Sequence, residues 1–172
     1  MPAERRPFPA LLARLHEHEF DYDEGAGMDF EPYQSFMSAE ETDQWMRAWT
    51  GNKSARGEAY LIFGQDGTGG YVAFWNAEPA RDLLEQPVVF FGSEGELGVI
   101  AENFSDYLWL LASGHGPYEA LAYPDDDTEP HAEFAAFAEE HAKTPRRGIT
   151  GILAAARAKY PNFESDIRAL TQ

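Results

Sequence analysis

The 172-residue sequence contains no cysteine. This absence excludes disulfide bonds, thiolate catalysis and cysteine-ligated zinc, and it is compatible with the reducing cytoplasm. No apolar run reaches the roughly 18 residues that a membrane-spanning helix needs. Arg14 interrupts the short apolar stretch FPALLARL, so we expect no signal peptide. These absences predict a cytoplasmic protein that has no contact with a membrane.

Basic residues are scarce, since 13 Lys and Arg face 30 Asp and Glu and the formal net charge is −17 at pH 7. Segment 82–142 contains 14 acidic residues and no Lys or Arg. Such a surface repels phosphates, so we expect no nucleic-acid partner. A basic protein would instead be attracted and steered to it. The alternative interpretation is that the charge serves only to keep the protein in solution.

Apolar periodicity predicts helices toward both ends of the chain and strands in the middle. Ser38 and Glu41 form a capping box, Gly51 ends that helix, and Asn103 is an N-cap for a later one. Helices are expected at 8–19, 38–50, 103–113, 131–142, 149–160 and 162–170, and strands at 59–63, 71–75, 88–92 and 97–101. This order predicts a single α+β domain over 1–172, with a mainly antiparallel sheet of about four to six strands flanked by N- and C-terminal helices.

The glycine-rich stretch FGQDGTGG, residues 63–70, suggests a phosphate-binding loop, but its details do not fit one. Gly70 and Tyr71 stand where a Walker loop needs Lys and Ser or Thr, and Val72 replaces the last glycine of a dinucleotide fingerprint. A strand follows instead of a helix. We therefore predict a hairpin in which Asp66 and Gly67 supply a left-handed turn.

Metal ligation and catalysis receive little support. Segment 21–32 lacks the EF-hand pattern, the acidic segment 122–130 is typical of a solvated loop, and His16 and His18 point apart on a helix. His115, between two glycines, could serve as a general base with Asp106 or Glu119, although a helix C-cap is the more usual role. We expect no enzymatic activity, no cofactor and no metal, and keep a hydrolase that uses His115 as a minor alternative.

Two stretches carry a family resemblance. AYLIFGQDGTGGYVAFW, followed by PVVFFGSEGELGVIAENFSDYLWLLASG, resembles the core of the SUKH superfamily. That family has a glycine-rich hairpin, paired strands and a helix of pattern A-x-(S/N)-F-x-x-(F/Y)-L-x-x-L. The positions that match this pattern are Ala101, Asn103, Phe104, Tyr107, Leu108 and Leu111. The resemblance covers 55–115 well and 38–115 more loosely, and it implies a SUKH-like fold.

The superfamily includes bacterial immunity proteins and the yeast cell-wall synthesis regulator. The resemblance therefore implies a protein that acts by binding, such as an immunity protein that occludes a basic, nuclease-like toxin. Charge and loop placement, rather than a family motif, suggest the contact residues. Trp109 joins them because it lies beside the apolar face of its helix, with partial burial against a neighbouring element as the alternative. The residues expected to bind the partner are Asp125, Asp126, Asp127, Glu94, Glu96 and Trp109. The alternative function is a regulatory or scaffolding module that binds its partner through apolar contacts.

Overall fold

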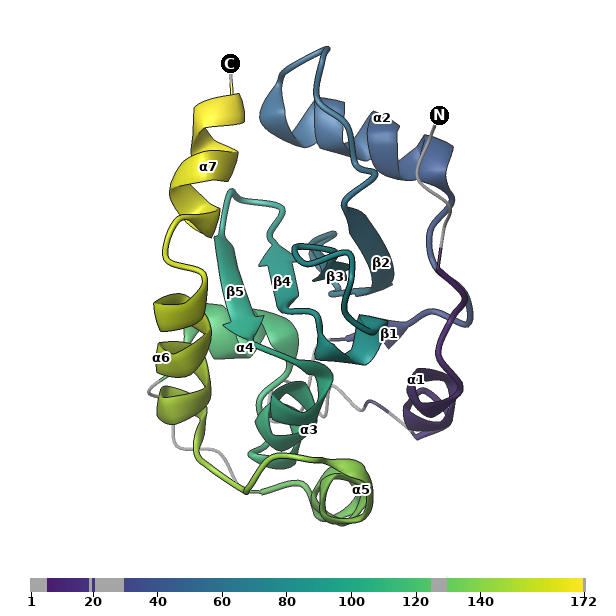
Figure 1. The fold of residues 1–172 in the computed structure, drawn as a ribbon, viewed down its shortest axis with the longest axis vertical. Helices are drawn as coiled ribbons and strands as arrows, with labels where there is room; N and C mark the ends of the chain where they lie inside the picture. The colour runs from purple at the N-terminus through teal and green to yellow at the C-terminus, as the bar shows by residue number, and fades with distance from the viewer. Residues whose placement is uncertain (1–5, 19, 21–29, 125–129, 172) are drawn as a thin grey trace.

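The computed structural model describes residues 6–18, 20, 30–124 and 130–171. The predicted α+β class is confirmed, because five antiparallel strands form one sheet in the order β1-β2-β3-β4-β5 and helices cover it (Figure 1). The strands are β1 Glu31–Pro32, β2 Tyr60–Gln65, β3 Tyr71–Trp75, β4 Val88–Phe91 and β5 Leu97–Ala101. The helices are α1 Ala10–Leu15, α2 Ala39–Thr50, α3 Phe104–Ala112, α4 Pro117–Ala122, α5 Ala132–His141, α6 Ile149–Lys159 and α7 Phe163–Leu170, with a short 3-10 helix, η2, at Leu83–Glu85.

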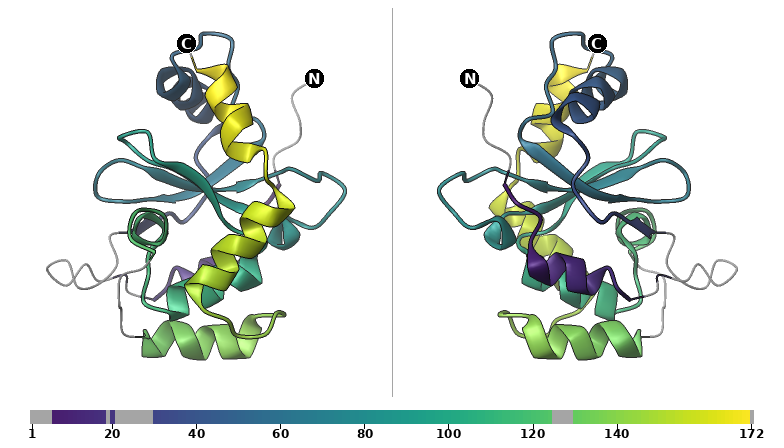
Figure 2. Two further views of the ribbon diagram at one scale, coloured as in Figure 1. Left: turned by 90° about the vertical axis from the view of Figure 1, so that its left-hand side faces the viewer. Right: turned by 90° about the vertical axis from the view of Figure 1, so that its right-hand side faces the viewer.

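The sheet divides the molecule into two cores (Figure 2). Successive side chains of a strand point to opposite faces, so the large apolar residues of β2 to β5 serve both sides. The upper core lies under α2 and α7 and includes Met46, Ile62, Phe91 and Phe163. The lower and larger core lies against α1, α3 and α5. Helix α6 runs beside the β5 edge and contributes to both cores.

The predicted caps are present. The Glu41 amide donates to the Ser38 hydroxyl, and Gly51 ends α2 with a left-handed φ of 67°. At α3 the Asn103 side chain accepts from the Asp106 amide at 2.8 Å. Satisfied helix ends of this kind fix where the helices begin and therefore which residues face the sheet.

The glycine-rich stretch is the hairpin between β2 and β3. Asp66 is buried, and one carboxylate oxygen accepts from the amide and hydroxyl of Thr68 and from the Gly70 amide. The predicted left-handed residue is wrong, however: Gly69, with a φ of 96°, has that conformation and Gly67 does not. The Asp66 carboxylate binds residues 68 and 70 and holds a longer turn. The left-handed residue therefore lies two positions after the predicted one, Gly67.

Sequence periodicity missed β1, η2 and α4. Strand β1 is two residues long and includes a proline, so it has no detectable pattern; it exists because Glu31 and Pro32 pair with Gln65 and Gly64 of β2.

Among the described residues, none of the helices has the length and apolar character needed to cross a membrane.

Candidate partner-binding groove

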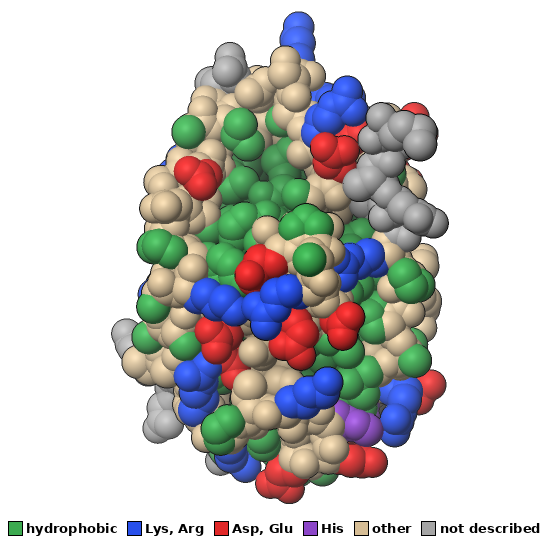
Figure 3. Space-filling view, viewed as in Figure 1, with side chains coloured by type: hydrophobic (Ala, Val, Ile, Leu, Met, Phe, Trp, Pro, Cys, Tyr) green, Lys and Arg blue, Asp and Glu red, His purple; other side chains and the backbone are tan. Residues whose placement is uncertain are grey.

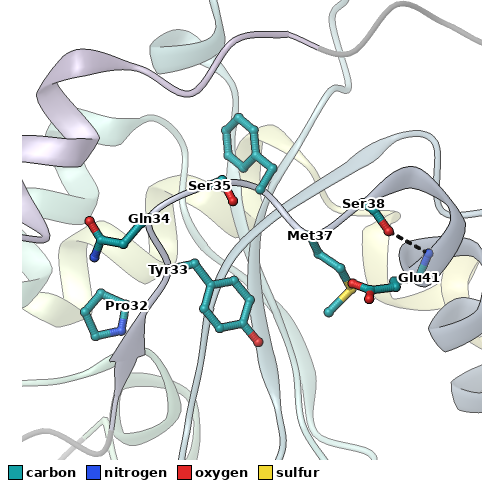
Figure 4. Close-up of a pocket in the computed structure, with 8 residues that line it drawn as sticks. Pro32, Tyr33, Gln34, Ser35, Met37, Ser38 and Glu41 are labelled. Carbon is teal, nitrogen blue, oxygen red and sulfur yellow. Dashed lines mark hydrogen bonds between the residues drawn. The ribbon is translucent and has the colours of Figure 1, made fainter.

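An open groove of about 570 Å³ lies where the chain passes from β1 to α2 (Figure 4). Its lining comes from one continuous stretch plus the first turn of the helix. The lining residues are Pro32, Tyr33, Gln34, Ser35, Phe36, Met37, Ser38 and Glu41. None of them is basic.

The segment that forms the groove is fixed at both ends to the edge of the sheet. The Tyr33 amide donates to the Phe63 carbonyl and the Met37 amide to the Ile62 carbonyl, each at 3.0 Å. Phe36 packs into the lower core, while Tyr33 and Met37 pack against the upper one. Because the segment straddles the sheet edge with side chains in both cores, the groove is formed before any ligand binds.

Three side chains converge on the groove. Figure 4 shows Tyr33 and Met37 projecting to the same side of the segment, with the Glu41 carboxylate pointing toward them. Glu41 takes this place because Ser38 caps α2, and its carboxylate is stabilised by the positive end of the helix. Among the described residues, neither Glu41 nor its neighbour Glu40 forms an ion pair.

A chain of hydrogen bonds determines which groups on the Tyr33 side of the groove donate and which accept. The Gln65 side-chain amide donates to the Glu31 carboxylate at 3.1 Å, and the Tyr33 hydroxyl donates to the Gln65 carbonyl oxygen at 2.5 Å. The direction of this chain follows from chemistry, since an ionised carboxylate only accepts and the amide nitrogen must therefore face it. The Tyr33 hydroxyl has thus used its proton, and its oxygen remains an acceptor.

The electrostatic environment of Tyr33 is negative. Burial raises the pKa of Tyr33 to about 12, and the neighbouring Tyr71, Glu31 and Glu41 add to the increase. A tyrosine pKa rises near carboxylates because the phenolate would be repelled by them. The same carboxylates favour a cation at this position.

An aromatic surface continues from the groove along α2. Trp45 follows Glu41 by one turn and meets the Tyr71 ring edge to face, with ring centroids 5.4 Å apart. Trp45 also packs on Phe91 at 4.9 Å, which ties it to the upper core. Acidic and aromatic groups therefore lie side by side at this edge of the molecule.

Of the residues that the sequence suggested as partner contacts, the described ones, Glu94, Glu96 and Trp109, do not line this groove. Glu94 and Glu96 lie in the β4–β5 turn, where the Glu94 amide donates to the Glu96 carboxylate at 2.9 Å. Arg168 of α7 donates to the Gly95 carbonyl in the same turn. Glu94 is exposed and Glu96 is partly exposed. Asp125, Asp126 and Asp127 lie outside the described residues.

The prediction that Trp109 contacts a partner is wrong, because the residue is buried. Only 6% of this residue is exposed, and its indole nitrogen donates to the Thr144 carbonyl at 2.8 Å. The Arg146 guanidinium lies 5.7 Å from its ring centroid. Trp109 is therefore an internal packing residue. The segment between α5 and α6 covers the side of α3 that the sequence suggested was free.

Several basic side chains form ion pairs with carboxylates of the same chain. Arg147 binds the fully buried Asp106 and also Glu102, while Thr144 donates to the other Asp106 oxygen at 2.9 Å. Other pairs join Arg81 to Glu78 and Glu85, Arg146 to Glu139, Lys159 to Glu78, and Arg168 to Glu164. The basic tail read from the sequence is thus partly neutralised. Among the described residues, no Lys or Arg forms an ion pair with Glu31, Glu40 or Glu41.

Asp106, one of the groups considered for catalysis, is bound by other residues. Its two carboxylate oxygens accept from Thr144 and Arg147. His115 is buried, and its ring nitrogen Nδ1 is 3.1 Å from the Ser113 hydroxyl. Across the described part of the chain, no cluster of three or more His, Asp or Glu side chains is arranged to hold a metal ion.

Comparisons with protein families, with curated proteins and with solved structures find no match for this chain. Sequence analysis did not predict the groove, because the groove depends on the pairing of residues 31–33 with β2. Two signals for it were present in the sequence: the capping box that places Glu41, and the aromatic Tyr33 directly after Pro32.

Proposed function

We propose that this chain is a non-catalytic protein-binding domain that docks a basic protein partner. The observation that carries the proposal is the groove of residues 32–41, which is preformed and lacks basic residues, with Glu31, Glu40 and Glu41 at or beside it. A preformed acidic surface binds a basic partner with little reorganisation, and long-range attraction accelerates the encounter.

The finer proposal is a cytoplasmic, SUKH-like immunity protein that occludes a toxin. It rests on the motifs of residues 59–111 and on the net charge of −17. A toxin that cuts nucleic acid needs a basic cleft to bind phosphates. An acidic domain seated in that cleft would block the substrate without performing any chemistry itself.

The test begins with capture of bound proteins from the organism that makes this chain, at about 50 mM salt, where screening is weak. The captured partner is then expressed alone and together with this chain in a bacterial host. The proposal expects a basic partner that arrests growth when alone, and restored growth on co-expression. Unrestored growth, or binding that survives unchanged at about 500 mM salt, would contradict it.

A second function is favoured by one observation. Figure 3 shows apolar side chains gathered in a hollow in the upper half of this face, between α7 and α2 as Figure 1 places them. The upper core also includes partly buried aromatic residues, among them Trp75 and Tyr160. A regulatory or scaffolding module could dock its partner here through apolar contacts. Such binding would be insensitive to salt and would weaken on Trp75→Ala.

A further inference from the structure

We propose that the groove of residues 32–41 receives the guanidinium group of an arginine presented by the basic partner. This inference rests on the proposed function and adds to it the chemical group that the groove recognises. It follows from four features of the groove: its hydrogen-bonding character, its aromatic surface, its size and its electrostatics.

Several polar groups at the groove can only accept hydrogen bonds, whereas Gln34, Ser35 and Ser38 in its lining can both donate and accept. The Tyr33 hydroxyl donates its one hydrogen bond to the Gln65 carbonyl oxygen, and the Gln65 amide donates to the Glu31 carboxylate. The carboxylates of Glu31 and Glu41 accept only. A ligand that satisfies these acceptors must itself donate, and the two side chains that are cationic at neutral pH, arginine and lysine, donate without accepting.

The aromatic surface favours arginine over lysine. Tyr33 lines the groove, and Tyr71 lies near it with its ring packed against Trp45. A guanidinium is planar, stacks on aromatic rings and presents a fork of donors that matches a carboxylate. An ammonium group is a compact, strongly hydrated charge and gains less from such a surface.

The size and the electrostatics of the groove agree with this ligand. A volume of about 570 Å³ falls within the roughly 300–1,000 Å³ typical of ligand sites, enough for one long side chain and part of its backbone. The groove adjoins the N-terminus of α2, which alone would favour an anion. Glu40 and Glu41 in the first turn place full negative charges there, so a cation is favoured.

The experiment uses two small probes with the complete ¹⁵N-labelled protein, observed by NMR. One is N-acetyl-arginine methylamide, and the other is its uncharged isostere, N-acetyl-citrulline methylamide. We expect the arginine probe to shift the amide signals of residues 33–41 and of Tyr71, and the citrulline probe to leave them in place. Glu41→Gln should weaken arginine binding about two- to five-fold, the range for an exposed ion pair.

Glu58→Gln is the matched control, because it removes the same charge from an exposed loop position outside the groove. It should leave the affinity for the arginine probe unchanged. The spectrum of each variant shows directly whether it is folded. Equal responses to the two probes, shifts spread over the whole acidic surface, or equal losses in the two variants would overturn the inference.

The inference and the proposed function can fail separately. If the arginine probe does not bind the groove but the captured partner still binds in a salt-sensitive manner, the partner uses another acidic surface and only the inference fails. If the partner binds without salt sensitivity, the proposed function fails whatever the probe does.

Discussion

The ion pair between Arg147 and Asp106 gives the sharpest prediction about stability. Asp106 is fully buried in α3, whereas the Arg147 side chain is 37% exposed. We consider Arg147→Met, which preserves most of the apolar stem and removes the charge. The buried carboxylate then keeps the Thr144 hydroxyl as a donor but loses its cation.

The expected cost follows from the burial of the two partners. Removing one member of a buried pair costs about 3–5 kcal/mol. Water screens the exposed part of Arg147, and Thr144 remains bound, so we expect a loss of about 2–3 kcal/mol in the free energy of unfolding. For a chain of this length, each kcal/mol lowers the melting temperature by about 2–4 °C. The variant should therefore melt about 4–12 °C lower.

The assay is urea unfolding at pH 7, with Arg146→Met as the control. Arg146 pairs with Glu139 at 3.6 Å, but the two side chains are 51% and 65% exposed, so its loss should cost less than about 1 kcal/mol. In an Asp106→Asn background, Arg147→Met should also cost less than about 1 kcal/mol, because no buried charge is left unpaired. Equal costs for the two arginine variants would refute the reasoning.

Three further variants test other parts of the structure by urea unfolding. Burial lowers the pKa of His16 below its usual 6.5 although its Nδ1–H donates to the Tyr33 carbonyl. The unfolded chain therefore binds more protons below pH 6.5, and stability falls with acidification. His16→Asn keeps a donor and should remove that part of the pH dependence. Gly64→Ala should cost about 1–3 kcal/mol, because a Cβ there would overlap the ring of Phe30, the residue directly before β1. Asp66→Ala should cost about 2–3 kcal/mol, because it removes three hydrogen bonds from the hairpin turn.

Each of these variants has an outcome that counts against the account. The His16 interpretation fails if the wild type and His16→Asn lose stability in parallel as the pH falls below 6.5. Wild-type stability in Gly64→Ala would mean that β1 does not depend on close contact with β2. An undiminished free energy of unfolding in Asp66→Ala would show that glycine alone determines the hairpin.

The sequence predicts correctly those caps and strands that depend on residues close to one another in the chain. The caps at Ser38 and Asn103, and the strands of alternating or continuous apolar residues, depend on neighbours in sequence, so their positions agree with the structure. The sequence predicts the left-handed residue at Gly67, but the structure has it at Gly69. The reason is that the Asp66 side chain, and not the Asp66-Gly67 dipeptide, sets the length of the turn.

The rest depends on contacts between distant segments. Strand β1 forms only where 31–32 meets β2, and the groove exists only because of that pairing. The sequence suggests Trp109 as a contact residue, with partial burial as the alternative, because nothing in its own helix shows that Thr144 and Arg146 contact it. The acidic composition is plain in the sequence, but which carboxylates pair with an arginine depends on the fold, as Asp106 and Arg147 show.

The most direct test of the central claim is the dissociation constant of the complex with the captured partner, measured by calorimetry as salt is raised from about 50 to about 500 mM. If acidic docking drives binding, the constant should rise steeply with salt, and Glu41→Gln should raise it further at low salt. A dissociation constant that stays the same across this range would contradict the claim.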